Sequence, residues 1–155
     1  MKKRMIIFVR VVLLILVIVC ISLVVYFRIN RIKGSVAITI NGEPYKVDCI
    51  ECKYNDKYEG VKYKNNDGKL KFKNKAFGHG MYEYSFSIRN EDINITPKIK
   101  VFKSNAKDMI NADIKINVYK NGDLWNADMN VSINGYTYTE SFVDIKNKEI
   151  QYRVE

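Results

Sequence analysis

The sequence has few of the residues from which enzyme sites and metal centres are built. Its 155 residues include one histidine, three cysteines, one tryptophan and two prolines. Zinc needs four ligands, and the chain offers two neighbouring cysteines and one histidine. A D-x-D-x-D-G calcium loop is absent, and the carboxylates form no convincing catalytic pair. We therefore predict no catalytic residue, no cofactor and no metal ion.

Acidic residues are missing from the first 33 positions, which carry seven basic residues. The whole chain has 26 basic and 17 acidic residues and a net charge of +9, so the chain beyond residue 33 has a net charge of only +2. Lys and Arg collect beside membrane-spanning segments because anionic headgroups attract them. The excess charge therefore predicts a membrane flank, and we expect no nucleic-acid partner.

A long uncharged run follows the basic start. Val11 to Phe27 comprises 17 residues without a charge, about 25 Å of helix at 1.5 Å per residue. Arg10 can extend toward the headgroups, so that Met5 to Val9 lengthen the span. The run shows no polar stripe of the kind that a buried core helix has. We predict a transmembrane helix over 5–27, preceded by a cytoplasmic tail over 1–4.

The flanks of this helix favour an uncleaved signal anchor. The run is longer than the apolar part of a signal peptide, and no small-x-small cleavage site follows it. Cys20 follows Val19, where a lipoprotein signal requires a small residue, so we interpret it as an apolar helix residue. Four basic residues precede the uncharged run that begins at Val11, and three follow it. This bias favours a cytoplasmic N-terminus, a juxtamembrane linker over 28–35 and an extracytoplasmic domain over 36–155.

The remainder alternates apolar and polar residues between turn signals, as strands do. Asn-Gly steps at 41, 121 and 134 suit type I′ hairpin turns because both residue types tolerate positive φ. Ser104 to Asn111 is the one plausible short helix. Eight to ten short strands of this kind predict an all-β, antiparallel sandwich. The predicted strands include Val36–Ile40, Tyr45–Ile50, Gly60–Tyr63, Leu70–Phe72, Tyr82–Ile88, Ile99–Val101, Ile114–Val118, Trp125–Ile133, Tyr136–Phe142 and Ile150–Val154.

Two of these segments carry a resemblance to a known class of module. Asn66-Asp67-Gly68-Lys69-Leu70-Lys71-Phe72, followed by Gly80-Met81-Tyr82-Glu83-Tyr84-Ser85-Phe86, resembles the closing half of carboxypeptidase-regulatory-like or transthyretin-like modules. Those modules run a D-G-x-apolar strand, a loop and a G-x-Y-x-apolar strand. The resemblance covers about twenty residues, and Lys75 to His79 replaces the Pro-Gly usual in the loop. It implies an immunoglobulin-like or prealbumin-like sandwich, a fold that often serves as a spacer or binding domain.

Cys49-Ile50-Glu51-Cys52 is the one motif with chemistry attached. Four interpretations stay open: a local disulfide, two free buried thiols, a zinc site, or a redox pair. A redox pair needs a helix N-terminus to lower one thiol pKa, whereas this segment is predicted to be a strand. Residues i and i+3 of a regular strand lie on opposite faces about 10 Å apart, so a bridge between Cys49 and Cys52 requires a bulge.

Basic and aromatic residues are interleaved from Lys53 to Lys75, where the net charge is +5. Lys69, Lys71, Lys73 and Lys75 share one face of a predicted strand. Such a face can bind an anionic polymer or headgroups. It can equally be a solvated outer face, or an edge strand that lysines protect from aggregation. His79 stands between two glycines, without an identifiable nucleophile or partner for general-base chemistry.

Three functional hypotheses follow. The first is a membrane-anchored, non-enzymatic β-sandwich outside the cytoplasmic membrane, presenting a binding surface to a cell-envelope protein or polymer. The second is a bitopic accessory subunit of a larger membrane complex, of the secretion or transfer type. The third is an enzyme that uses His79 or the cysteines, which requires His79, an acid and a nucleophile in one pocket.

Overall fold

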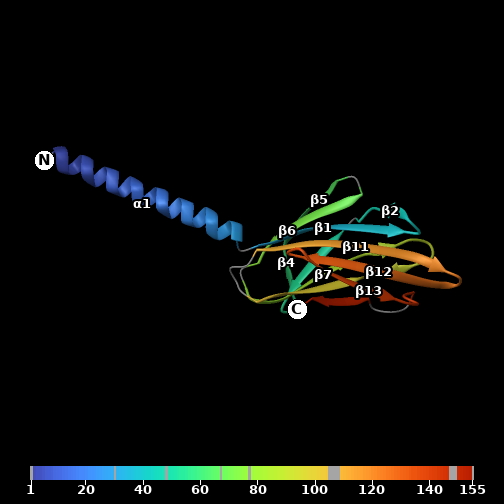
Figure 1. The fold of residues 1–155 in the computed structure, drawn as a ribbon. Coiled ribbons are helices and arrows are strands. Elements are labelled where there is room, and N and C mark those ends of the chain that lie inside the picture. The colour runs from blue at the N-terminus through green and yellow to red at the C-terminus, as the bar shows by residue number, and fades with distance from the viewer. Residues whose placement is uncertain are drawn as a thin grey trace.

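A computed structural model describes residues 2–29, 31–47, 49–66, 68–76, 78–104, 109–146 and 150–154. The described chain is one helix followed by a domain made almost entirely of strands (Figure 1). The elements are α1 (Lys2–Ile29), β1 (Arg31–Ile40), β2 (Glu43–Tyr45), β3 (Ile50–Tyr54), β4 (Lys57–Glu59), β5 (Val61–Asn66), β6 (Lys69–Lys75), β7 (Gly80–Phe86), β8 (Ile88–Arg89), β9 (Asn94–Ile95), β10 (Lys98–Lys103), β11 (Ile110–Asn121), β12 (Leu124–Ile133), β13 (Tyr136–Phe142) and β14 (Gln151–Val154).

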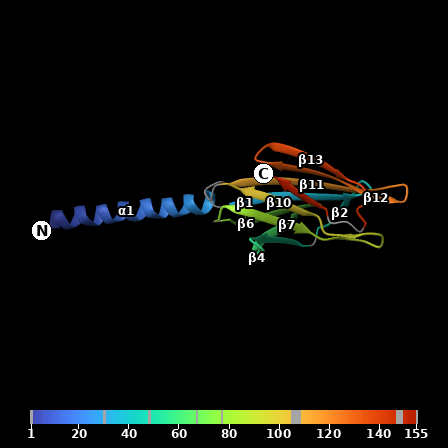
Figure 2. The same ribbon diagram turned by 90° about the horizontal axis from the view of Figure 1, so that it is seen from below.

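Helix α1 contains the segment Met5–Tyr26, whose 22 residues are long and apolar enough to cross a membrane. At 1.5 Å per residue this segment reaches about 33 Å, close to the thickness of a bilayer's hydrocarbon core. Every described side chain of the segment is exposed, and α1 extends away from the strands in both ribbon views (Figures 1 and 2). The apolar run therefore has no protein core to cover it.

The sequence placed a linker over 28–35, but β1 already begins at Arg31. Only one residue separates the end of α1 at Ile29 from this strand. The expectation was wrong because Ile32 is the only strongly apolar residue from Arg31 to Ser35, which hides the alternation. The position that follows Ile32 on the inner face is Gly34, and its missing side chain gives no hydrophobic signal.

The strands form two main sheets. The first, sheet A, has the order β13-β12-β11-β1-β6-β5, with β2 also paired to β1. The second, sheet B, has the order β14-β10-β7-β3-β4, and β8 pairs with β9 separately. Most pairs are antiparallel, but β1 pairs with β11 in parallel and β10 pairs with β14 in parallel. The expectation of a purely antiparallel arrangement is therefore corrected to mixed sheets.

The two main sheets share one hydrophobic core. Alternate residues of each strand turn inward, as period-two alternation requires; they include Ile38 and Ile116 of sheet A and Phe86 and Ile99 of sheet B. The ring of Phe72 on β6 lies 5.0 Å from that of Tyr84 on β7, which joins the sheets directly.

A buried polar contact accompanies this ring contact. The hydroxyl of Tyr84 donates to Asn74 Oδ1 at 2.6 Å, and Asn74 Nδ2 lies 3.7 Å from the Sγ of Cys52. Asn74 belongs to sheet A, whereas Tyr84 and Cys52 face each other in sheet B. Buried polar groups are costly unless paired, so this contact favours one particular alignment of the two sheets.

The turns agree with the sequence in part. Both residues have positive φ at Asn41-Gly42 and at Asn134-Gly135, as type I′ turns require. At Asn121-Gly122 the two-residue loop is instead Gly122-Asp123, and of these two residues only Gly122 has positive φ. The sequence missed a further two-residue turn at Asn55-Asp56, where both residues have positive φ without a glycine.

Two predicted elements need correction. The sequence paired Tyr45–Ile50 with the first strand, but only Glu43–Tyr45 pairs there, and Ile50 begins β3 in the other sheet. The predicted helix over 104–111 lies partly outside the described residues, at 105–108. Its last two residues, Ile110 and Asn111, belong to β11.

Gly34 is predicted to be essential for the alignment of β1 with its neighbours. A Cβ built at Gly34 would lie 2.0 Å from the carbonyl oxygen of Ala112 and 2.8 Å from the ring of Phe72. We expect Gly34→Ala to lower the free energy of unfolding by about 1–3 kcal/mol, because β1 would have to move away from β11. Urea unfolding of the full-length protein in detergent measures this loss.

Gly60→Ala is the matched control. A Cβ at Gly60 meets nothing within 4 Å, and Gly60 is not among the glycines with positive φ. We expect this change to leave stability unchanged or to raise it by about 0.4–1 kcal/mol, because alanine restricts the unfolded chain. Equal losses in both variants would contradict the close packing of β1 against β11 and Phe72.

Candidate functional site

Strand β6 presents a row of lysines on the outside of sheet A. Its burial alternates along Lys69–Lys75: the four lysines are exposed, whereas Leu70, Phe72 and Asn74 are buried. The lysines thus share one face opposite Leu70 and Phe72, as the sequence predicted. However, β6 lies between β1 and β5, so it is not an edge strand. Protection of a sheet edge therefore does not explain these lysines.

The register places further basic residues beside this row. Arg31 and Lys33 of β1 lie opposite Lys75 and Lys73, and Lys62 and Lys64 of β5 lie opposite Lys73 and Lys71. We call this set the basic face: Arg31, Lys33, Lys62, Lys64, Lys69, Lys71, Lys73 and Lys75. The sequence singled out only its β6 members, because the alternation within one strand does not reveal which strands lie beside it.

The basic face contains four pairs of like charges directly opposite each other on neighbouring strands. They are Arg31–Lys75, Lys33–Lys73, Lys62–Lys73 and Lys64–Lys71. Directly opposed like charges destabilise a sheet, whereas opposite charges at the same positions would stabilise it. The arrangement therefore carries an energetic cost that folding alone does not account for.

A carboxylate forms an ion pair with one of these cations. Asp113 of β11 is 3.8 Å from the Nζ of Lys69 and accepts a hydrogen bond from the hydroxyl of Ser35. Both charged side chains of this ion pair are substantially exposed, at 45% and 64%, so the pair contributes little to stability. Within the described part of the chain, no carboxylate lies at ion-pair distance from Lys33, Lys62, Lys64, Lys71 or Lys73.

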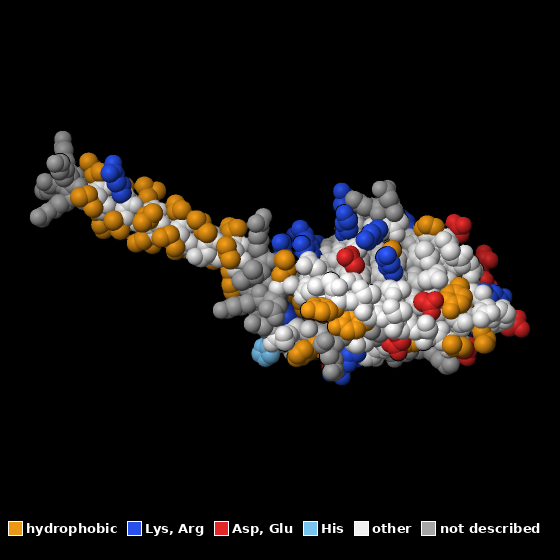
Figure 3. All heavy atoms as spheres, in the orientation of Figure 1, with side chains coloured by type: hydrophobic (Ala, Val, Ile, Leu, Met, Phe, Trp, Pro, Cys, Tyr) orange, Lys and Arg blue, Asp and Glu red, His pale blue; other side chains and the backbone are white. Residues whose placement is uncertain are grey.

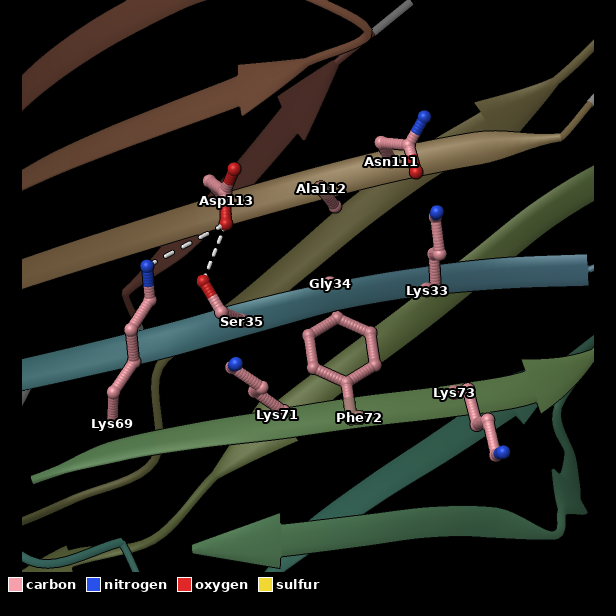
Figure 4. Close-up of a pocket in the computed structure, with 10 residues that line it drawn as sticks. All are labelled: Lys33, Gly34, Ser35, Lys69, Lys71, Phe72, Lys73, Asn111, Ala112 and Asp113. Carbon is pink, nitrogen blue, oxygen red and sulfur yellow. Dashed lines mark hydrogen bonds and ion pairs between the residues drawn. The ribbon is translucent and has the colours of Figure 1, made fainter. Parts of the chain in front are cut away.

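A shallow open depression of about 380 Å³ crosses the basic face. Figure 4 shows Lys33, Lys71 and Lys73 around it, with Asp113 and Lys69 at one side. Gly34, Phe72 and Ala112, which face the core, also line it. The depression is open to solvent and lined by cations, so it suits an extended anionic chain better than a small enclosed substrate.

Charge is segregated along the domain. In Figure 3, Lys and Arg side chains gather over β1, β5 and β6 toward the helix, and Asp and Glu side chains gather at the opposite end. The exposed carboxylates of the described chain include Glu43 on β2, and Glu91, Asp92, Asp123 and Asp144 in turns and short connections. A domain with a small net charge can thus still attract anions at one end.

The two cysteines of the C-x-x-C motif have different environments and are not bridged. Cys49 is exposed, Cys52 is 1% exposed, and both thiols are free. The bulge that a bridge requires is absent, because β3 pairs continuously with β7 from Ile50 onward. Burial raises the pKa of Cys52 to about 12, and a thiol held in its protonated form is a poor nucleophile.

His79 lies on the loop between β6 and β7. Its carbonyl oxygen accepts a hydrogen bond from the hydroxyl of Tyr54 at 2.9 Å, and that of Gly78 accepts one from Tyr82 at 3.2 Å. The buried Lys103 donates to the carbonyl oxygen of Ala76 in the same loop. These donors hold the backbone, whereas the imidazole is exposed. Among the described residues, no carboxylate, hydroxyl or thiol bonds to that imidazole, and no group of three metal-binding side chains is found.

Comparison of the chain with protein-family models, curated proteins and solved structures finds no match.

The alkaline limit of stability should depend on Cys52. Its pKa in the fold is about 12 against 9.0 in an unfolded chain, so its protonated form is favoured by folding. This contribution is complete below pH 9 and is lost as the pH rises toward 12. Burial raises the pKa of Tyr82 to about 12 and that of Tyr84 well above its usual value, which acts in the same direction. We expect Cys52→Ala to flatten the fall in stability above pH 9, measured by denaturant unfolding at several pH values.

Thiol labelling checks the same assignment. At neutral pH, a maleimide should modify Cys49 in the folded protein and reach Cys52 only after unfolding. Rapid modification of Cys52 at pH 7 would contradict its burial and its raised pKa.

The repulsion within the basic face should be measurable as well. At low salt, we expect the free energy of unfolding of the double variant Lys64→Gln/Lys71→Gln to be about 0.2–1 kcal/mol higher than that of the native protein. The gain should vanish near 1 M salt, where the screening length is about 3 Å. The control Lys57→Gln/Lys120→Gln removes two lysines that lie opposite Tyr54 and Trp125, and it should show no such gain. A gain that is independent of salt would argue against repulsion as its cause.

Proposed function

We propose that this chain is a single-pass membrane protein whose β-domain binds an anionic polymer of the cell envelope through the basic face. Segment Met5–Tyr26 crosses the membrane as an uncleaved anchor, with the N-terminus in the cytoplasm and the domain outside. The domain is a non-enzymatic binding module. Its ligand is an extended polyanion, because the cations are spread over three strands and surround an open depression.

The observation that carries this proposal is the set of four opposed like-charge pairs. A polyanion lying across β5, β6 and β1 offsets the repulsion between these opposed cations. Binding of this kind is largely electrostatic, and it weakens steeply with salt because bound counterions are released. A solvated surface without a ligand leaves the repulsion in place and offers nothing to offset it.

We further propose that the fold is an immunoglobulin-like or prealbumin-like sandwich, as the resemblance to carboxypeptidase-regulatory-like and transthyretin-like modules implies. In support, the two segments that carry the resemblance form β6 and β7, which lie in opposite sheets across one core. The parallel pairs β1–β11 and β10–β14 depart from an all-antiparallel arrangement. A sandwich of this kind is compatible with many functions, so the proposal for the ligand rests on the basic face alone.

The second candidate function is an accessory subunit of a larger membrane complex, and strand β13 favours it. In the described chain β13 is an edge of sheet A, paired only with β12. Its seven residues contain neither lysine nor proline, the residues that usually protect an edge, and Tyr136 is 73% exposed. Such an edge can accept a strand from a partner protein.

An enzyme that uses His79 or the cysteines has less support. The imidazole of His79 is exposed on a loop, and the thiol of Cys52 is buried with a raised pKa of about 12. The side-chain polar neighbours of that thiol are the amide of Asn74, which cannot act as a general base, and the hydroxyl of Tyr84, whose pKa burial raises well above its usual value.

Binding of inorganic polyphosphate to the full-length protein in a neutral detergent tests the proposal. We expect Lys64→Gln/Lys71→Gln to weaken binding about tenfold or more and to lower the salt dependence, since each phosphate contact contributes to that slope. The control Lys57→Gln/Lys120→Gln removes the same net charge elsewhere and should change affinity less than twofold. Fluorescence anisotropy of a labelled polyphosphate measures both. Equal losses in the two variants would show attraction to net charge rather than a site, and would refute the proposal.

A further inference from the structure

A second concave site lies at the end of the basic face that is nearest to the helix. It has a volume of about 440 Å³, and its cations are Arg31 of β1, Lys62 of β5, and Lys73 and Lys75 of β6. Among the described residues that line it, Glu59, the last residue of β4, is the one carboxylate. Four cations around one carboxylate leave an excess of positive charge in a site that three strands hold in register.

The side chain of Arg31 gives this site its specific chemistry. Its Nε is buried, and among the described residues no acceptor lies within hydrogen-bond distance of it. A buried donor without an acceptor is costly, and such donors in folded proteins usually have a partner in water, an ion or a ligand. The planar guanidinium group matches the oxygens of a phosphate, to which it can donate two parallel hydrogen bonds.

The position of Arg31 in the chain places this site beside the membrane. Three helical residues and two peptide links separate Arg31 from Tyr26, the end of the apolar segment. These span roughly 12 Å along the chain axis at most, at 1.5 Å per helical residue and 3.8 Å per extended link. The headgroup layer itself is about 5–8 Å thick, so an arginine side chain at this height can reach it.

We propose that this site binds the phosphodiester headgroup of an anionic phospholipid in the membrane that α1 crosses, with phosphatidylglycerol as the matching chemistry. The guanidinium group of Arg31 donates to the phosphate, and Lys62 and Lys73 neutralise the phosphate's charge. Glu59 accepts hydrogen bonds from the glycerol hydroxyls and disfavours a dianionic phosphate. The proposal rests on the membrane anchoring proposed above, but it holds for either orientation of α1 and does not need the polymer-binding role.

Native mass spectrometry of the full-length protein tests the site by counting retained lipids. The protein is released from a neutral detergent after incubation with phosphatidylglycerol or with phosphatidylcholine. We expect the native protein to retain phosphatidylglycerol in preference to phosphatidylcholine. In Arg31→Gln/Lys62→Gln, the ratio of retained phosphatidylglycerol to retained phosphatidylcholine should fall about tenfold. Arg31→Lys keeps the charge but not the planar donor pair, so it should show an intermediate loss.

The matched control is Lys64→Gln/Lys71→Gln, which removes the same charge farther along the basic face and should retain the lipid. Equal lipid retention by Arg31→Gln/Lys62→Gln, or equal loss in the control, would overturn the proposal. Complete displacement of the lipid by soluble glycerol phosphate would show that the site binds a free phosphate ester, and would contradict a membrane lipid as its ligand. Thermal melting followed by circular dichroism verifies folding, and Lys75→Gln replaces the double variant if that variant does not fold.

The two proposals fail independently. Loss of polyphosphate binding in Lys64→Gln/Lys71→Gln with normal lipid retention supports the polymer site alone. Loss of the phosphatidylglycerol preference in Arg31→Gln/Lys62→Gln but not in Lys64→Gln/Lys71→Gln supports the lipid site, whatever the effect of the first variant on polyphosphate binding.

Discussion

The arrangement of this molecule depends on the pairing of β1 at the centre of sheet A. This strand pairs with β6 on one side and with β11 in parallel on the other, and it follows the helix after a single residue. Because β11 lies about 78 residues farther along the chain, sheet A closes only after most of the domain has been synthesised. Such distant pairings make folding slow, since the chain between them loses entropy before the contact forms.

The same strand also sets which part of the domain lies next to the helix in the chain. β1 begins at Arg31, shortly after α1 ends at Ile29. The positions nearest the helix are therefore also the first positions of β1, and their partners Lys73 and Lys75 are held there by register. The basic end of the domain is thus built into the topology, because any strand paired with the start of β1 lies close to α1.

Local patterns in the sequence predicted most strands but not their partners. Alternation in Tyr82–Phe86 and Trp125–Val131 placed the buried residues correctly, because each strand has one apolar and one polar face. Parallel pairing leaves no local signal, since it depends on contacts between segments far apart in the chain. The turn at Asn55-Asp56 was missed for a related reason: it lacks the glycine that usually marks positive φ.

The candidate site was likewise predictable only as far as it lies within one strand. The row of lysines in β6 was predictable from one strand, whereas its interior position and its opposed cations on β1 and β5 required the register. Arg31 gave no signal at all, because in the sequence it is one of several basic residues that flank an apolar helix. A residue of that kind is ordinarily explained by the membrane flank alone, and only its buried Nε distinguishes it.

Under the two proposals made above, electrostatic screening lets the near and far parts of the basic face bind different ligands. Lys75 lies opposite Arg31 beside the helix, and Lys71 is four residues farther from it, about 13 Å at 3.3 Å per strand residue. The screening length at physiological ionic strength is about 8 Å. Headgroups that strongly attract Arg31 and Lys75 therefore act only weakly on Lys71 and its partner Lys64. In these proposals the far part of the face stays available to a soluble polyanion while lipid occupies the near part, so one continuous surface would serve both the anchoring and the binding.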